Sequence, residues 1–276
     1  MIRNLPTRRN SANHQANLRR WMTVILASCL LTVSCTASAE VAEDSLQEPS
    51  GMSASSTPGQ FWLVSDAGPD IALVDETGAT IKTISIDLPD TDWEGIVELE
   101  NGNLLVAEER RYELIEIDPH IGTIVAINAL SEMDGFDAIA SLITQSSENK
   151  GLEGITVDGT GDIWVVKESE PALLIQVDAD RTSIKSWIDP SPALANHLGV
   201  GAKKIDLSGL APHTDSEKLW ILSHKASTAF IWNTVTSTID ESHALDLDKA
   251  EGIAAHPDGV LIVDENSGRL VVIDVP

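Results

Sequence analysis

Cysteine, aromatic residues and positive charge are all scarce in this chain. Its two cysteines, Cys29 and Cys35, lie near the N-terminus, so the chain after Cys35 carries no disulfide bond and no cysteine-based zinc or redox site. Aromatic residues make up 4% of the sequence, and the formal net charge is -25. Both features disfavour nucleic acid as a partner, and the charge favours cations or basic partners.

The common enzyme signatures are absent as well. The sequence contains no glycine-rich phosphate loop between a strand and a helix, no His-Glu-x-x-His, no Gly-x-Ser-x-Gly and no cysteine nucleophile. We therefore lean toward a binding protein and leave an enzymatic role open. If the protein is an enzyme, a metal-dependent hydrolase fits these absences best.

The N-terminal stretch differs in composition from the rest. Arginines are the only charged residues before Cys35, and an apolar run extends from Trp21 to Val33. This run is shorter than the ~20 residues that a membrane-spanning helix needs. It predicts an export signal over residues 1–39, followed by an acidic linker over 40–49 and a globular domain over 50–276.

Two processing sites compete within this signal. Ala37-Ser38-Ala39 before Glu40 fits the small-x-small rule for a released protein. The stretch that ends at Cys35 resembles a bacterial lipobox, which would make Cys35 the lipidated first residue. Both forms stay open, with an uncleaved anchor as a third. We expect an exported protein, in the periplasm or anchored in the cell envelope, that touches the membrane only through such an anchor.

An internal repeat organises the rest of the chain. A phrase of Glu or Ser, then Gly, then an apolar residue occurs five times at similar spacing. Each copy is followed by a second apolar run and then by a third, which end at Glu109 and Asp118 in the second unit. The five copies begin at Ser50, Glu94, Glu153, Ser208 and Glu251.

Three to four short runs per unit, each ending in Asp or Gly turn residues, are typical of a propeller blade. We predict an all-β fold, a β-propeller with five blades (six as the alternative) of three to four antiparallel strands. The fifth unit stops at the C-terminus without an outermost strand. Either the stretch before Ser50 supplies that strand, or the last blade has three.

The repeat also predicts an acidic ring at one mouth of the channel. The first strand of each blade lines the axis, and its hairpin puts the start of that strand beside the end of the second. Glu94, Glu153 and Glu251 would surround the opening. A second set of acidic side chains would stand behind them: Asp66, Glu109, Glu168 and Glu265.

Two interpretations of this ring stay open. Like charges in a narrow cleft repel, so they are protonated or neutralised by a cation. Oxygen ligands without thiols suit calcium, and suit magnesium or manganese less well. Alternatively, the carboxylates accept hydrogen bonds from neighbouring strand ends and only tie the blades together.

Other residues of the repeat are candidates for the same mouth. His224 replaces the carboxylate in the fourth unit and is a candidate general base, or else a packing residue. Trp93, next to Glu94, is a candidate ligand wall. Three tryptophans share a second-strand position and are predicted to pack between blades: Trp62, Trp164 and Trp220.

Four phrases carry a family resemblance. They are Asp92-Trp93-Glu94-Gly95-Ile96 with Val106-Ala107-Glu108-Glu109-Arg110, Asn149-Lys150-Gly151-Leu152-Glu153-Gly154-Ile155 with Lys167-Glu168, Asp206-Leu207-Ser208-Gly209-Leu210 with Leu222-Ser223, and Ala250-Glu251-Gly252-Ile253. Together they resemble the SdiA-regulated (YjiK-like) family. The resemblance implies a bacterial envelope β-propeller with a signal or membrane anchor and no settled activity.

More distantly, the chain is similar to calcium-dependent propeller hydrolases such as gluconolactonases and phytases. That likeness implies Glu94, Glu153 and Glu251 as calcium ligands, although the Asn and Asp ligands of those enzymes have no match here. The first hypothesis is an envelope-associated binding module with an acidic, calcium-binding mouth and an unknown small-molecule or protein ligand. The second is a calcium-dependent hydrolase of a lactone or phosphoester with His224 as base. The third is a metal-free interaction scaffold, and a monomer is expected throughout.

Overall fold

In the computed structural model, the described residues are 38–40, 46–143 and 150–275. The predicted signal up to residue 37, with the lipidation candidate Cys35, lies outside them. None of the described helices is long and apolar enough to cross a membrane.

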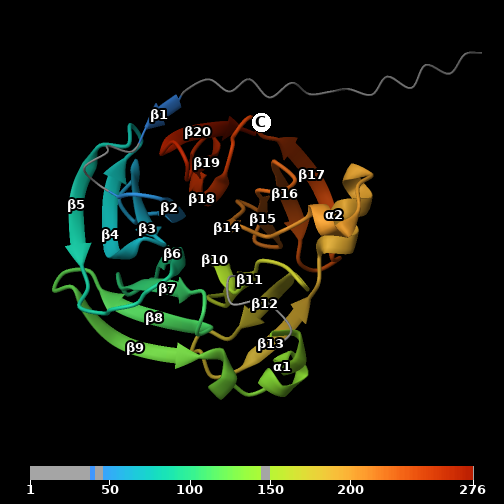
Figure 1. The fold of residues 1–276 in the computed structure, drawn as a ribbon, viewed down its shortest axis with the longest axis horizontal. Coiled ribbons are helices and arrows are strands. Elements are labelled where there is room, and N and C mark those ends of the chain that lie inside the picture. Colours follow the sequence, from blue (N-terminus) through green and yellow to red (C-terminus); the bar gives the residue numbers. More distant parts are fainter. Residues whose placement is uncertain (1–37, 41–45, 144–149, 276) are drawn as a thin grey trace, which may run out of the picture. The chain divides into compact units, whose positions relative to one another are not determined.

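Five four-stranded antiparallel sheets form the domain, and Figure 1 shows them arranged as blades around a common centre. Four blades follow the chain order from their inner to their outer strand. Blade 1 contains β2 (Pro49–Ala54), β3 (Gln60–Ser65), β4 (Gly68–Asp75) and β5 (Thr80–Ser85). Blade 2 contains β6 (Trp93–Glu98), β7 (Leu104–Glu108), β8 (Glu113–Asp118) and β9 (Thr123–Ala129).

Blades 3 and 4 repeat this order. Blade 3 contains β10 (Leu152–Val157), β11 (Ile163–Lys167), β12 (Leu173–Val177) and β13 (Ile184–Ile188). Blade 4 contains β14 (Gly209–Pro212), β15 (Lys218–Ser223), β16 (Thr228–Asn233) and β17 (Thr238–Ala244). The five-bladed all-β prediction is confirmed.

Blade 5 takes its outermost strand from the other end of the domain. It contains β18 (Ala250–His256), β19 (Gly259–Asp264) and β20 (Arg269–Asp274), and β1 (Ser38–Glu40) pairs antiparallel with β20. The paired residues are Ser38 with Val271, Ala39 with Leu270 and Glu40 with Arg269. The stretch before Ser50 therefore completes the last blade, which is the first of the two predicted ways of closing the ring.

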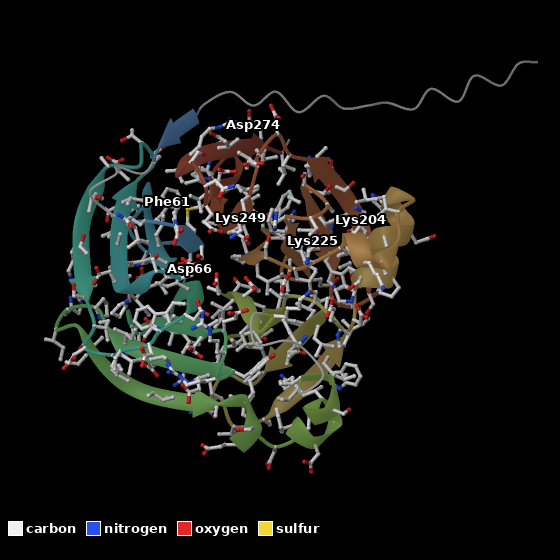
Figure 2. The ribbon with its side chains drawn as sticks, viewed as in Figure 1. Phe61, Asp66, Lys204, Lys225, Lys249 and Asp274 are labelled. Carbon is white, nitrogen blue, oxygen red and sulfur yellow. The ribbon has the colours of Figure 1, made fainter. Side chains whose placement is uncertain are left out.

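The hydrophobic core consists of layers between neighbouring blades. Each of the five buried clusters joins side chains from two adjacent sheets, and Figure 2 shows side chains filling the ribbon ring. Trp62, Trp164 and Trp220 are all buried and belong to three of these layers, as predicted. Burial of apolar side chains from the inner strands of each blade provides most of the driving force for the ring.

Glycine is required where the inner strands of neighbouring blades meet. A Cβ atom on Gly95 would lie 2.3 Å from the carbonyl oxygen of Glu153, and one on Gly154 would lie 2.5 Å from the backbone nitrogen of Leu210. Real Cβ atoms do not approach backbone atoms this closely. The Glu-Gly pair of the repeat is therefore explained at its second position by blade-to-blade packing.

Short helices lie in the segments that join blades 2 and 3 and blades 3 and 4. The first segment contains η1 (Leu130–Glu132), η2 (Phe136–Ala138) and α1 (Ala140–Ile143), and the second contains α2 (Ser191–Leu198) and η3 (Ala202–Lys204). Helix α2 buries Leu194 and Ala195 in the layer between blades 3 and 4. In Figure 1 it lies at the outer side of the ring, beside β17.

Candidate functional site

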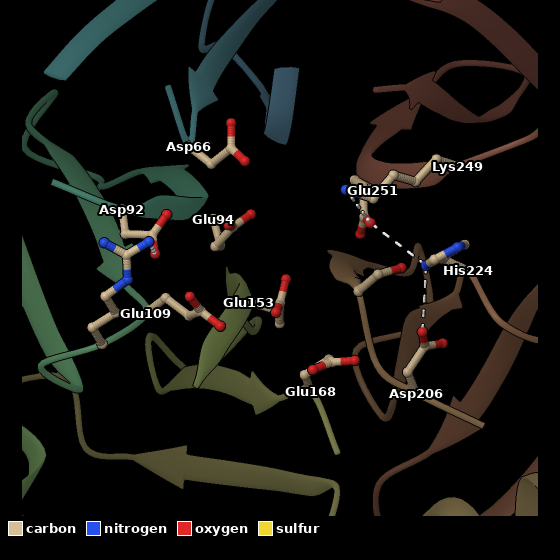
Figure 3. A pocket seen from close by; sticks show the side chains of 12 residues that line it. Asp66, Asp92, Glu94, Glu109, Glu153, Glu168, Asp206, His224, Lys249 and Glu251 are labelled. Carbon is tan, nitrogen blue, oxygen red and sulfur yellow. Dashed lines mark ion pairs between the residues drawn. The ribbon is translucent and has the colours of Figure 1, made fainter. Parts of the chain in front are cut away.

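An acidic cavity of about 260 Å³ opens at one mouth of the channel. Eight carboxylate side chains line it, together with Arg110, Ser208, His224 and Lys249 (Figure 3). The carboxylates are Asp66, Asp92, Glu94, Glu109, Glu153, Glu168, Asp206 and Glu251. The three glutamates of the repeated phrase are therefore gathered at one opening, as the sequence predicts.

The cavity narrows toward the interior of the ring. Just below the acidic side chains, at the level of the inner glycines, the channel narrows to a space of about 10 Å³, which is roughly the room for one water molecule. Apolar side chains close it: Met52, Ile96, Ile155, Leu210 and Ile253. The site is a cup with a polar wall and an apolar floor.

A β-bulge at the start of the inner strand places each glutamate. In blade 2, Trp93 pairs with Glu108 and Gly95 with Ala107, so Glu94 is the extra residue between two regular pairs. The same shift surrounds Glu153 and Glu251, and it recurs around Ser50 in blade 1. A bulge turns one side chain out of the strand's alternation, and the three turned glutamates line the cup, whereas Ser50 does not.

A compact oxygen cluster lies at the blade 2 side of the cup. Asp92, Glu94 and Glu109 each present a carboxylate oxygen, and these oxygens lie within 4.8 Å of one another. Two ligands of one calcium ion can span about 5 Å, because calcium–oxygen distances are 2.3–2.6 Å. Asp92 and Glu109 are buried, and Glu94 is partly exposed toward the cavity. This group could hold a metal ion.

Burial and mutual repulsion raise the pKa values of these carboxyl groups. Burial, together with a hydrogen bond shared with Asp92, raises the pKa of Glu109 to about 8. Burial also raises the pKa of Glu251 to about 8, and the pKa of Asp66 to about 6. The pKa values of Glu94 and Glu153 lie well above the ordinary range, because both are buried among other carboxylates. Several of these groups hold protons at neutral pH when no cation neutralises them.

Like Asp66, the glutamates Glu94 and Glu153 are cup carboxylates without a partner among the described residues. Within the part of the chain that the structure describes, no hydrogen bond or ion pair reaches either side chain, although Glu153 is only 8% exposed. Figure 3 shows both pointing into the shared space. A purely structural role does not account for these two residues, because each buries a polar carboxyl group without a compensating contact.

Other residues of the cup do link neighbouring blades. The Gly151 backbone N–H donates to Glu109 at 3.1 Å, and the Lys225 ammonium donates to Glu168 at 2.8 Å. His224 reaches from blade 4 toward blade 5, with its Nδ1 atom 3.7 Å from Glu251. At these positions the side chains do connect neighbouring blades, as the structural interpretation predicts. They form the wall around Glu94 and Glu153.

Positively charged side chains pair with some of the carboxylates. Arg110 pairs with Asp92 at 2.6 Å, and the Lys249 ammonium lies 3.6 Å from Glu251 and pairs more closely with Glu265. Glu265 is thus held by Lys249 and does not line the cavity, whereas Asp66 and Glu168 do. The predicted ligand wall Trp93 is fully buried in the layer between blades 1 and 2 and also does not line it.

Sequence reasoning missed residues that lie two positions before the repeated phrase in three of the five units. Asp92, Asp206 and Lys249 all occupy this position and line the cup. Asp206 accepts hydrogen bonds from the Ser223 hydroxyl at 2.7 Å and from the Lys225 backbone at 3.0 Å. Their shared position relative to the repeated phrase was a usable signal in the sequence. The bulge explains it: in blade 2, the residue before the first paired residue Trp93 and the residue after it both face the cup.

A comparison with protein families finds the SdiA-regulated family over residues 32–267. The chain belongs to the SdiA-regulated family. No curated protein matches it. Among solved structures, the glutaminyl cyclase of Myxococcus xanthus is 13% identical with a TM-score of 0.59, and the match covers 88% of this chain and 96% of that one.

The virginiamycin B lyase of Staphylococcus aureus is 12% identical with a TM-score of 0.49. That match covers 83% of this chain and 66% of the lyase, so this member of the SdiA-regulated family spans about two thirds of the lyase's length. At such identities the likenesses concern the propeller fold alone.

Proposed function

We propose that the protein is an exported, cell-envelope-associated binding module whose acidic cup holds a calcium ion. The observation that carries this proposal is the oxygen cluster of Asp92, Glu94 and Glu109 beside the unpartnered Glu153. A divalent cation would replace the protons that these groups otherwise hold, and it would remove the repulsion between them. Calcium accepts six to eight oxygen ligands in a flexible geometry, which suits several carboxylates around one opening.

The cation is tested on the purified domain after removal of metal with a chelator. Calcium and magnesium are titrated separately by calorimetry, and the melting temperature is followed in parallel. We expect calcium to bind more tightly and to raise the melting temperature. Glu94→Gln should weaken calcium binding by more than about tenfold, the loss that even an outer-shell partner causes. The matched control, Glu100→Gln, changes an exposed glutamate outside the cup and should leave affinity unchanged.

A failure of calcium to bind or to stabilise the protein would overturn the metal proposal. The metal-free interaction scaffold would then be the remaining function, with the rim of the cup as its surface. In either case the partner is a small molecule or a protein, and the net charge of -25 favours a basic or cationic one.

The pairing of β1 supports processing at Cys35 for the exported form. Cleavage before Glu40 would remove Ser38 and Ala39, two of the three residues that pair with β20. A mature chain that begins at a lipidated Cys35 keeps all three. Mass spectrometry of the N-terminal peptide decides between these forms, and a free Glu40 terminus would contradict anchoring.

A second candidate function is a calcium-dependent hydrolase, and the position of His224 favours it. Its Nδ1 atom lies 3.5 Å from Asp206 and 3.7 Å from Glu251, and its side chain lines the cup. An imidazole oriented by a carboxylate beside a cation site suits a general base. Lactones and phosphoesters are assayed with and without chelator. Turnover that needs calcium and is lost in both His224→Ala and Glu153→Gln would favour the enzyme.

A further inference from the structure

A second cavity, of about 680 Å³, lies between blades 3 and 4, next to the acidic cup. Its wall comes from four places: the segment just before β10, the β11–β12 turn, the segment from α2 to η3, and the β15–β16 turn. Three lysines line it: Lys150, Lys203 and Lys225. We call it the lysine cavity.

The charge of this cavity is opposite to that of the protein. Only 18 residues of the chain are Lys or Arg, against 43 Asp and Glu, yet three lysines converge here. Two carboxylates also line the cavity, Glu170 and Asp189. The Asp189 carboxylate accepts the Ser191 backbone N–H at 2.9 Å, so this carboxylate already has a partner within the chain.

The partners of the lysines leave room for a ligand. The Lys150 ammonium lies 3.2 Å from Glu170, whose side chain is 68% exposed. An ion pair with so exposed a partner is weak, so an anion in the cavity can replace Glu170. Lys225 is held by Glu168 on the wall of the acidic cup, and Figure 2 places it between α2 and the centre of the ring.

The walls of the cavity are preformed. The Lys167 ammonium is fully buried and donates to the backbone carbonyl groups of Ser169 and Pro171, which fixes the β11–β12 turn. The apolar side chains of Ala172 and Ile205 belong to the core layer below. A cavity of about 300–1,000 Å³ with an apolar wall and a few placed charges is typical of a small-molecule site.

We propose that the lysine cavity binds a small organic anion. Its carboxylate or phosphate group contacts Lys150, Lys203 and Lys225, and its apolar part lies against Ala172 and Ile205. This binding does not depend on a cation in the acidic cup, so the proposal stands or falls separately from the calcium site.

The test uses three probes on the mature protein in chelator: benzoate, phenyl phosphate and uncharged benzyl alcohol. Calorimetry at constant ionic strength should show saturable binding of one or both anions and none of the alcohol. A preference between the two anions identifies the ligand as a carboxylate or a phosphate. Equal binding of benzyl alcohol, or no binding of either anion, would overturn the proposal.

Two variants move the affinity in opposite directions. Lys150→Gln combined with Lys203→Gln should weaken anion binding by roughly tenfold, which corresponds to two partly exposed charge pairs. Glu170→Gln removes the competing carboxylate and should strengthen binding by about two- to threefold. The control, Lys185→Gln, removes a lysine that pairs with Asp162 and does not line the cavity.

Glu170 is exposed, so its substitution should leave the melting temperature unchanged and gives a result even if the double variant is unstable. Affinities that are the same in wild type, Glu170→Gln and the double variant would refute the assignment. Lys225 is left intact in these variants because it also holds Glu168.

Discussion

Glu109 and Glu251 show how strongly a single carboxyl group is affected by its place in the cup. In the folded protein the pKa of each of these two groups is raised to about 8, whereas the ordinary value is 4.5. Between these two pH values the folded state binds more protons than the unfolded state, so stability falls as pH rises. Each such group contributes a slope of about 1.4 kcal/mol per pH unit.

We therefore predict that the melting temperature of the chelated protein falls between pH 5 and pH 8. Saturating calcium should flatten this dependence, since the bound ion replaces the protons. Differential scanning fluorimetry across this range, with chelator or with calcium, measures both curves. A chelated protein that is most stable at pH 8 would contradict the raised pKa values.

Lys249 gives a second prediction at the scale of one residue. Its ammonium neutralises part of the charge of Glu251 and Glu265, so it competes with any cation that enters the cup. Lys249→Gln should lower the melting temperature in chelator and increase the affinity for calcium. Lys82→Gln is the matched control, because the Lys82 ammonium donates to the Pro119 carbonyl and does not line the cup. Unchanged calcium affinity in Lys249→Gln would place the ion away from Glu251.

The glutamates of the repeated phrase and the residues at the second-strand ends could be predicted from the sequence, whereas Asp92, Asp206 and Lys249 were missed. Glu94, Glu153 and Glu251 reach one cavity because the same spacing recurs in their blades. Trp93 illustrates the limit. It neighbours Glu94 in the sequence, but the bulge turns Glu94 into the cup while Trp93 remains in the layer between blades.

At the scale of the strand, the inner glycines leave no room for a larger side chain. Gly95→Ala would place a methyl group against the Glu153 carbonyl, so the two inner strands must separate. We predict a loss of about 2–3 kcal/mol in the free energy of unfolding, the upper part of the range for overpacking. Urea denaturation measures it.

The control for this prediction is Gly201→Ala. No atom lies within 4 Å of a Cβ at Gly201, and its φ of -80° suits any residue. Its effect should stay within about 0.5 kcal/mol, as is usual at the surface. Equal effects of the two substitutions would mean that the contact between inner strands is not rigid.

The strands themselves were predictable, because their apolar runs and turn residues recur with one period. Two ways of completing the last blade stayed open at the level of the sequence, because β1 has only three residues and no periodic pattern that predicts a strand. Its pairing depends on the unpaired edge of β20, which exists only once β18, β19 and β20 have paired in blade 5. Long-range closure of this kind leaves little trace in local sequence.

At the scale of the whole molecule, the ring of blades brings many of the protein's carboxylates together in one cavity. The chain has a net charge of -25, and eight carboxylates line a single cavity of about 260 Å³. The channel narrows to about 10 Å³ at the inner glycines, so the mouth is the wide opening of this cavity. Charge on the outer surface is screened by salt, whereas charge inside the cup is screened much less.

This difference separates two contributions to stability. In chelator, raising NaCl from about 0.05 M to about 0.5 M shortens the Debye length to a few ångströms, and it should raise the melting temperature modestly by reducing surface repulsion. Calcium chloride at the same ionic strength should raise it further, because the ion binds among the buried carboxylates. Glu94→Gln should abolish the additional effect of calcium and preserve the effect of NaCl. If calcium does no more than sodium at matched ionic strength, neutralisation is diffuse and the cup is not a specific cation site.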